Sequence, residues 1–173
     1  MTAAAANTRS HKRHSMSKTL LGMLAVTAAL AVGCGGSKTY ESSDGKMTVD
    51  KKGDTVNYEI KTKEGKATMT ASDKGVAIPD TFPKDVPIPK GATPKMTMSQ
   101  GKTELLHLSV PGSVAEVAKD YTEKLKKEGW EIESSMNMGD TSMVMGKKGA
   151  RKCAAVVAKD DAGALVQLSV SQE

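Results

Sequence analysis

Short segments in which apolar and polar residues alternate, separated by charged turns that contain glycine, recur along much of this chain. Between 45 and 75 three such segments follow one another at intervals of ten or eleven residues. Alternation with a period of two places one set of side chains on one face of a β-strand. The apolar sets are Met47 and Val49, then Val56, Tyr58 and Ile60, then Ala67, Met69 and Ala71. The pattern predicts a β-meander over 45–75, whose thin apolar face needs a larger partner for more than marginal stability.

A proline-rich segment follows the predicted meander. Residues 76–94 contain five of the six prolines of the chain. Proline fixes its own φ and pushes the preceding residue toward extended geometry, so we expect a stiff connector rather than a helix. Phe82, Val86 and Ile88 leave two alternatives open: a strap that packs onto the neighbouring domain, or a solvated linker.

Residues 95–173 have the pattern of a domain with a single helix. Ser113 followed by Glu116 forms a capping box, and Gly129 is placed to end the helix. Apolar residues recur at helical spacing between these signals, at Val114, Val117, Ala118, Tyr121 and Leu125. Strands are expected at 95–99, 103–110, 130–138, 141–147, 152–159 and 164–171. The order ββαββββ predicts an α+β fold, a two-layer antiparallel sheet with one packed helix, preceded by the small β-meander.

The N-terminal residues have the organisation of a signal peptide. Arg9, Lys12, Arg13 and Lys18 form a basic region without acids, and the uncharged run 19–33 follows. Fifteen residues are fewer than the roughly 20 that a helix needs to cross the hydrocarbon core of a bilayer. A cleaved signal peptide over 1–33 is therefore favoured over a permanent transmembrane helix.

The end of this run resembles the lipobox of bacterial lipoproteins. Leu30-Ala31-Val32-Gly33 directly precedes Cys34. The resemblance implies that Cys34 becomes the N-terminus and carries fatty acids such as palmitate, which makes it the lipidation site. Several acyl chains on one residue satisfy the requirement of two hydrophobic signals for stable anchoring. The alternative is an ordinary secretory signal with an incidental cysteine.

The residues after Cys34 predict how the anchored domain is connected to the lipid and which membrane holds it. Glycine and polar residues over 34–44 predict a flexible tether. Gly35 stands where many Gram-negative lipoproteins retained in the inner membrane have aspartate, so the sequence favours the outer membrane if the organism has one.

Removal of the leader changes the charge balance. Four of the 25 lysine and arginine residues and none of the 20 acidic residues precede Cys34, which leaves 21 basic against 20 acidic residues. A chain so nearly neutral has no electrostatic footprint for nucleic acid, and a nucleic-acid partner is excluded. With Cys34 acylated, Cys153 is the one remaining thiol, and its apolar surroundings predict a small buried side chain.

A wider resemblance covers the chain from 82 to the C-terminus. The segment FPKDVPIPKGA (82–92), then Tyr121, Leu125, Gly129 and Trp130 in a Tyr-x-x-x-Leu-x-x-x-Gly-Trp pattern, are similar to an arrangement in uncharacterised bacterial lipoproteins. The resemblance implies a fold and no activity. Physically, the large side chains fill a helix-to-strand corner, and they are expected in the core.

The mature sequence lacks the usual signatures of catalysis. It contains one histidine, His107, on the strand face opposite Leu106 and Leu108, and no Gly-x-Ser-x-Gly, His-Glu-x-x-His, Walker or Gly-x-Gly-x-x-Gly motif. We expect no enzyme activity and no cofactor. The sequence favours a lipid-anchored, non-catalytic module of the cell envelope that contacts an unknown envelope protein or cell-wall polymer.

Paired methionines give an alternative function, Cu(I) or Ag(I) binding in the envelope. Three Met-x-Met pairs lie on predicted strands, and thioethers prefer soft cations. The candidate ligands are Met136, Met138, Met143, Met145 and His107. Core packing is favoured instead for Met136 and Met138, which share a predicted strand face with Ile132. Orientation discriminates: methionines that face the helix are core, and methionines that face water together need a functional explanation.

Overall fold

The computed structural model describes residues 36–63 and 65–172, so the predicted signal peptide and Cys34 lie outside the described residues. The described residues form ten strands and one helix. The strands are β1 (Ser37–Ser42), β2 (Gly45–Lys52), β3 (Thr55–Thr62), β4 (Gly65–Ser72), β5 (Thr93–Gln100), β6 (Thr103–Val110), β7 (Glu131–Asn137), β8 (Thr141–Lys148), β9 (Arg151–Asp160) and β10 (Gly163–Gln172), and the helix is α1 (Val114–Lys127). No helix among these residues is long and apolar enough to span a bilayer.

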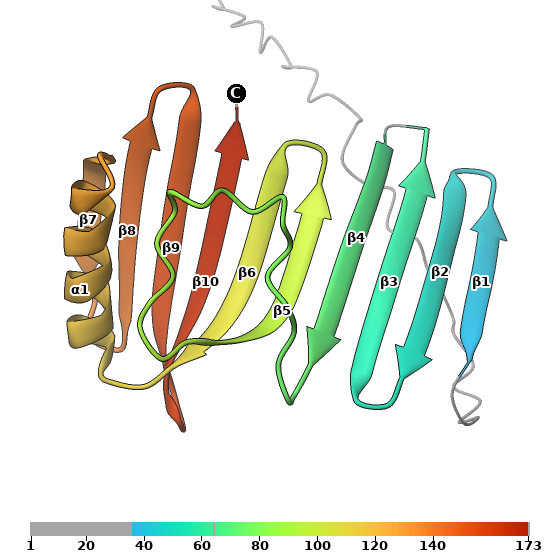
Figure 1. Ribbon diagram of the computed structural model, residues 1–173, viewed down its shortest axis with the longest axis horizontal. Helices are drawn as coiled ribbons and strands as arrows, with labels where there is room; N and C mark the ends of the chain where they lie inside the picture. The colour runs from blue at the N-terminus through green and yellow to red at the C-terminus, as the bar shows by residue number, and fades with distance from the viewer. Residues whose placement is uncertain (1–35, 64, 173) are drawn as a thin grey trace, which may run out of the picture. The chain divides into compact units, whose positions relative to one another are not determined.

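All ten strands belong to one antiparallel sheet, in the order β1-β2-β3-β4-β5-β6-β10-β9-β8-β7 (Figure 1). The expected combination of an antiparallel sheet with one helix is confirmed. The predicted meander does not lean on the rest of the chain through a face: β4 pairs edge to edge with β5, and this joins it to the C-terminal strands.

The first strand was not expected. Residues 37–42 fall in the segment predicted to be a flexible tether, yet they pair with β2 over the whole of β1. The correction has a simple cause: all residues of β1 are exposed at the edge of the sheet, where polarity does not distinguish a strand from a linker.

Helix α1 has the predicted ends. The Ser113 side chain accepts a hydrogen bond from the Glu116 backbone N–H, and the Glu116 carboxylate accepts one from the Ser113 backbone N–H. At the other end Gly129 adopts a φ of 80°, and the Trp130 N–H donates to the Leu125 carbonyl at 3.0 Å. This is a Schellman termination, which needs the left-handed conformation that glycine adopts without strain. The buried residues of α1 are the predicted Val114, Val117, Ala118, Tyr121 and Leu125.

The proline-rich segment 76–92, called the strap below, is packed rather than solvated. Phe82 and Val86 are 5% and 2% exposed and belong to the main core. The Trp130 indole N–H donates to the Asp85 backbone carbonyl at 2.8 Å. In Figure 1 the strap crosses β6, β10 and β9. The first of the two alternatives for this segment is therefore correct.

Asp85 fixes the strap to β8 and β9 through charge. Its carboxylate accepts hydrogen bonds from both terminal nitrogens of Arg151, at 2.8 and 2.6 Å, and from Lys148 Nζ at 2.8 Å. The same guanidinium lies 5.2 Å from the centroid of the Trp130 ring. Arg151 first and then Lys148 hold the pKa of Asp85 well below its usual range, against the opposing effect of burial.

Candidate functional site

The register of the sheet assigns each paired strand residue to one of two faces. Residues directly opposite each other in antiparallel strands project to the same side. One side carries Leu106 and Leu168, which pair across β6 and β10 and belong to the core formed with α1 and the strap. We call it the helix face and the opposite side the far face. Helix α1 packs against β7 to β10, and Figure 1 shows the strap on the same side as α1.

The polarity of the two faces reverses between the two ends of the sheet. In β6 and β8 to β10 the buried apolar residues project to the helix face. In β1 to β4 the helix face is polar: Thr39, Glu41, Lys46, Thr48, Asp50, Asn57, Glu59, Lys61, Lys66, Thr68, Thr70 and Ser72. The far face of these four strands carries Tyr40, Met47, Val49, Val56, Tyr58, Ile60, Ala67, Met69 and Ala71, which we call the N-terminal apolar face. These side chains therefore lie on the side of the sheet that the helix and strap leave uncovered.

The N-terminal apolar face is a partly exposed surface. Tyr40 and Ile60 are each 41% exposed, and the other members are half-buried by their neighbours in the sheet. The apolar surface continues onto the far face of the next strands, where Met98 pairs with Met69 and with Leu105. Contiguous apolar patches of more than a few hundred Å² are rare on soluble monomers and mark interaction surfaces.

The charges around this surface have one sign. Among the paired residues on the far face of β1 to β4, the charged side chains are Lys38 and Lys51. Lys38 lies near the start of β1 and Lys51 near the end of β2, which pair in antiparallel fashion, so both lie toward the same end of the sheet.

The helix face of the same strands carries both signs in ion pairs. Lys61 and Lys66 contact the Glu59 carboxylate at 2.7 and 2.6 Å, and these hydrogen bonds lower its pKa to about 2. Lys46 contacts Glu41 at 3.0 Å across β1 and β2. This face has the composition of an ordinary solvated surface, which the far face does not.

The methionine positions correct the sequence analysis. Met136 is 45% exposed and Met138 64% exposed, so the expectation that this pair belongs to the core is wrong. The cause is a β-bulge: Ile132 pairs with Gly146 but Ser134 pairs with Met145, which leaves one extra residue in β7. A single extra residue reverses the faces of everything after it, and Met136 projects to the far face.

The proposed soft-metal ligands are only partly brought together. Met136 pairs directly with Met143, and Met145 projects to the same far face. His107 lies on β6, and β10 and β9 separate it from β8, a spacing of roughly 14 Å at about 4.8 Å per strand. The histidine instead pairs with Met96 on the far face. Within residues 36–63 and 65–172, no three His, Cys, Asp or Glu side chains are grouped as metal ligands.

His107 projects away from Leu106 and Leu108, as predicted. Partial burial lowers its pKa, which favours the neutral imidazole. A neutral imidazole beside a thioether has the donor character that soft and borderline cations accept.

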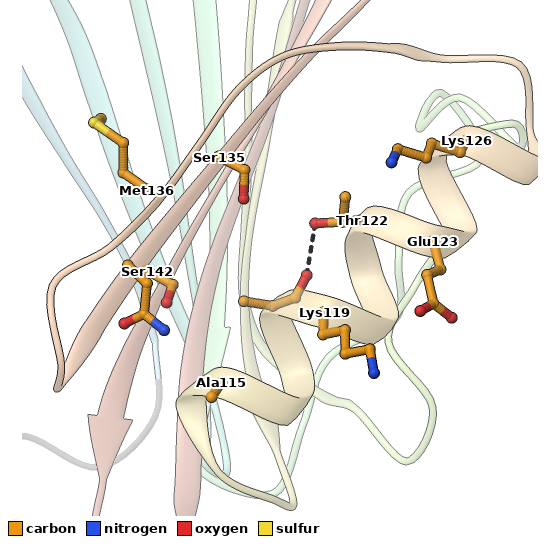
Figure 2. Close-up of a pocket in the computed structure, with 10 residues that line it drawn as sticks. Ala115, Lys119, Thr122, Glu123, Lys126, Ser135, Met136 and Ser142 are labelled. Atoms are coloured by element: carbon orange, nitrogen blue, oxygen red, sulfur yellow. Dashed lines mark hydrogen bonds between the residues drawn. The ribbon is translucent and has the colours of Figure 1, made fainter.

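A pocket of about 320 Å³ lies between α1 and the strands β7 and β8 (Figure 2). Its walls include Lys119, Thr122 and Glu123 from the helix and Ser142 from β8. The Ser142 hydroxyl is buried and has no hydrogen-bond partner, while Thr122 donates to the Ala118 carbonyl at 2.8 Å. A serine nucleophile requires a base within hydrogen-bond reach, and Ser142 makes no such contact. The pocket therefore holds no assembled nucleophile–base pair.

Cys153 is 1% exposed, as expected, and its Sγ lies 3.5 Å from the Tyr121 hydroxyl oxygen. Burial raises the pKa of both groups. A thiol with a raised pKa in an apolar site is a poor nucleophile, so this pair contributes packing.

Eight of the nine members of the N-terminal apolar face could be identified from the sequence, but not the side of the molecule on which they lie. Alternation marked the apolar residues of β2, β3 and β4 as one face of each strand. Which side of the molecule that face occupies depends on the pairing of β4 with β5, which no local pattern encodes. Tyr40 was missed altogether, since β1 was not expected.

Comparison with known proteins identifies one similarity. Residues 92–171 match a family model described as START domain-like, a segment that runs from the start of β5 into β10. No curated protein and no solved structure matches the chain. The match thus concerns the strands on which α1 and the strap pack, and β1 to β4 lie outside it.

Proposed function

We propose that this chain is a lipid-anchored, non-catalytic module of the cell envelope, held by acyl chains on Cys34, with its uncovered sheet face as the binding surface. In this proposal residues 1–33 are a signal peptide that is removed. Residues 95–173 act as a two-layer α+β unit, in which α1 and the strap close one side of the sheet. The chain then serves as a binding or structural component rather than as an enzyme.

The N-terminal apolar face is the single observation that carries the proposal. Its nine members stand together on the side that α1 and the strap do not cover. Apolar surface of this kind is costly in water and is retained where a partner covers it. The candidate catalytic groups support the non-catalytic part: Ser142 lacks a base, the pKa of Cys153 is raised, and His107 lies on the other side of the sheet.

Mass spectrometry of the protein purified from its native envelope tests the anchor. A mature chain that begins at Cys34 with added acyl mass is expected. The Cys34→Ala variant should remain unprocessed, while Cys153→Ala, the matched substitution of the other cysteine, should be processed normally. An unmodified amino terminus downstream of Cys34 would contradict the proposal.

Cu(I) or Ag(I) binding remains a second candidate function, and the orientation of the methionines favours it. Seven strand methionines project to the far face: Met47, Met69, Met96, Met98, Met136, Met143 and Met145. None of them fills the core beneath α1, which was the alternative explanation for their number. The pairs Met96–His107 and Met69–Met98 place four soft or borderline donors on adjacent strands.

Titration of the mature protein with Ag(I) tests this second candidate. Binding tighter than micromolar that weakens in Met96→Leu, and not in Met145→Leu, would assign the ligands to β4, β5 and β6. Absence of binding in this range would remove metal handling as a function.

A further inference from the structure

The N-terminal apolar face lies on the strands that are nearest in sequence to Cys34, the expected site of lipid attachment. β1 begins at Ser37, three residues after Cys34. Three extended residues span at most roughly 11 Å. Because β1 takes up most of the segment that was expected to be a tether, an acylated Cys34 at the bilayer surface would hold the start of β1 within roughly 11 Å of that residue, a distance comparable to the headgroup layer of roughly 5–8 Å on each side of the hydrocarbon.

We infer that the N-terminal apolar face docks flat onto an anionic phospholipid surface. The inference rests on the proposed lipid anchor and specifies the orientation of the anchored domain. Nine apolar side chains would enter the interfacial region, and the polar helix face of β1 to β4 would stay in water. The bilayer then supplies the cover that α1 and the strap provide on the other side of the sheet for β6 and β8 to β10.

The composition of the surface fits this occupant. Tyr40 and Tyr58 are rings with a polar tip, which are favoured at the boundary between headgroups and acyl chains. Met47 and Met69 add flexible apolar chains that adapt to an irregular surface.

The charges fit the same occupant. Lys38 and Lys51 stand on the far face toward the end of the sheet where β1 begins, beside the expected anchor. Their charge is complementary to anionic headgroups, and their stems can lie along apolar surface while the ammonium groups reach the phosphates. The acids of β1 to β3, such as Glu41, Asp50 and Glu59, project to the opposite side.

Neighbouring positions in β3 provide a matched pair of probes. Ile60 projects to the far face and Lys61 to the helix face, and both are exposed. Single Ile60→Cys and Lys61→Cys variants can carry a fluorophore at these positions. Cys153 is buried and Cys34 would be acylated, so neither competes for the label.

The experiment uses the mature protein purified from the envelope, checked for acylation by mass spectrometry, and reconstituted into phosphatidylcholine vesicles with and without phosphatidylglycerol. In anionic vesicles, the label at 60 should be quenched by lipids brominated on their acyl chains and protected from aqueous iodide. The label at 61 should show the reverse. Equal access of iodide to both labels on an acylated protein would overturn the docking inference and leave the anchor intact.

Substitution of the two far-face lysines tests whether charge contributes to docking on anionic lipid. Combined Lys38→Gln and Lys51→Gln substitutions should shift the ratio of docked to undocked protein by roughly thirtyfold, since each basic residue near an anionic leaflet contributes about 1 kcal/mol. The control carries Lys46→Gln and Lys52→Gln on the helix face of β2, with the same change in net charge. A similar loss in both variants would indicate a nonspecific effect of net charge and contradict the proposed orientation.

Two further outcomes separate the alternatives. If the label at 60 is protected from both quenchers and crosslinking shows a dimer, a second copy of the chain covers the face, and the lipid assignment is wrong. If Cys34 carries no acyl group, the proposed function fails, and the Ile60→Cys variant is labelled in a Cys34→Ser background, so that Cys34 does not compete for the label, and added to preformed vesicles. Bromolipid quenching at 60 would then still support lipid docking, and its absence would overturn it.

Discussion

The two ends of this sheet place their apolar side chains on opposite faces. β6 and β8 to β10 bury apolar side chains on the helix face, under α1 and the strap, where Leu106, Leu108 and Leu168 are fully buried. β1 to β4 present theirs on the far face, where Tyr40 and Ile60 remain 41% exposed. A strand needs only one covered face, and the chain supplies that cover for one end. The comparison teaches that the same alternating pattern can lead to a covered apolar face at one end of a continuous sheet and an exposed one at the other.

The largest expected difference lies between equivalent truncations in the two halves. Leu106→Ala should lower the free energy of unfolding by about 2–5 kcal/mol, since it leaves a cavity in a closed core. Met69→Ala, on the uncovered far face, should cost less than about 1 kcal/mol because no closed cavity forms. Urea unfolding of the mature protein in the absence of lipid measures both. Similar losses would show that the far face is covered in solution.

The next largest loss of stability is expected for the strap, which packs on the helix face of the C-terminal strands. Asp85→Asn should cost about 1–3 kcal/mol, since it removes charged hydrogen bonds to Arg151 and Lys148. Arg151→Lys should cost less, because one ammonium group retains the charge but loses the paired hydrogen bonds.

The same carboxylate makes stability depend on pH. The pKa of Asp85 is lower in the folded state than in the unfolded chain, so its contribution is fully present above the unfolded pKa of about 4. It is lost as the pH falls from there toward the lower folded pKa. Unfolding curves from pH 6 to about pH 2 should show this loss in the wild type and a smaller one in Asp85→Asn. A pH dependence unchanged by the substitution would contradict the assignment.

A smaller effect is expected at the buried polar site of the C-terminal half. Ser142→Ala should stabilise the protein by up to about 1 kcal/mol, since the hydroxyl is buried without a hydrogen-bond partner. Thr70→Ala in β4 is the control, because its hydroxyl donates to the Asn57 side chain at 2.9 Å and its loss should be slightly destabilising. Thermal unfolding of the two variants gives the sign. Destabilisation by Ser142→Ala would mean that the hydroxyl binds water or a ligand in the pocket.

The smallest effect belongs to the solvated face of the N-terminal half. Titration of Glu59 by NMR should give a pKa of about 2, which its hydrogen bonds to Lys61 and Lys66 produce. Because the group is solvated, Glu59→Gln should change the unfolding midpoint less than any substitution above. An effect as large as that of Asp85→Asn would indicate that this face is also covered.

Much of the local structure could be predicted from the sequence. The capping box at Ser113, the end of α1 at Gly129 and the strand at 103–110 all depend on residues within one or two turns or on a period of two. Such signals are local, and local physics suffices to interpret them.

The candidate surface could not be predicted in the same way. Alternation separates the two faces of a strand but does not say which face meets a neighbouring layer. Pairing between strands fixes the face of each residue: Leu106 pairs with Thr97, and Thr97 pairs with Thr70, so all three project to the helix face. One extra residue near Glu133 is enough to reverse the faces of the residues that follow it in β7.

By itself, then, the sequence determined where the helix, the turns and the strands other than β1 form and, outside the bulge in β7, which side chains of each of these strands stand together. Only the tertiary structure decided that the apolar side chains of β1 to β4 and those of β6 and β8 to β10 lie on opposite sides of one sheet, and that the strap is packed. The physical reason is that backbone hydrogen bonds across strands carry orientation over the whole sheet, while a side-chain pattern carries it only within its own strand.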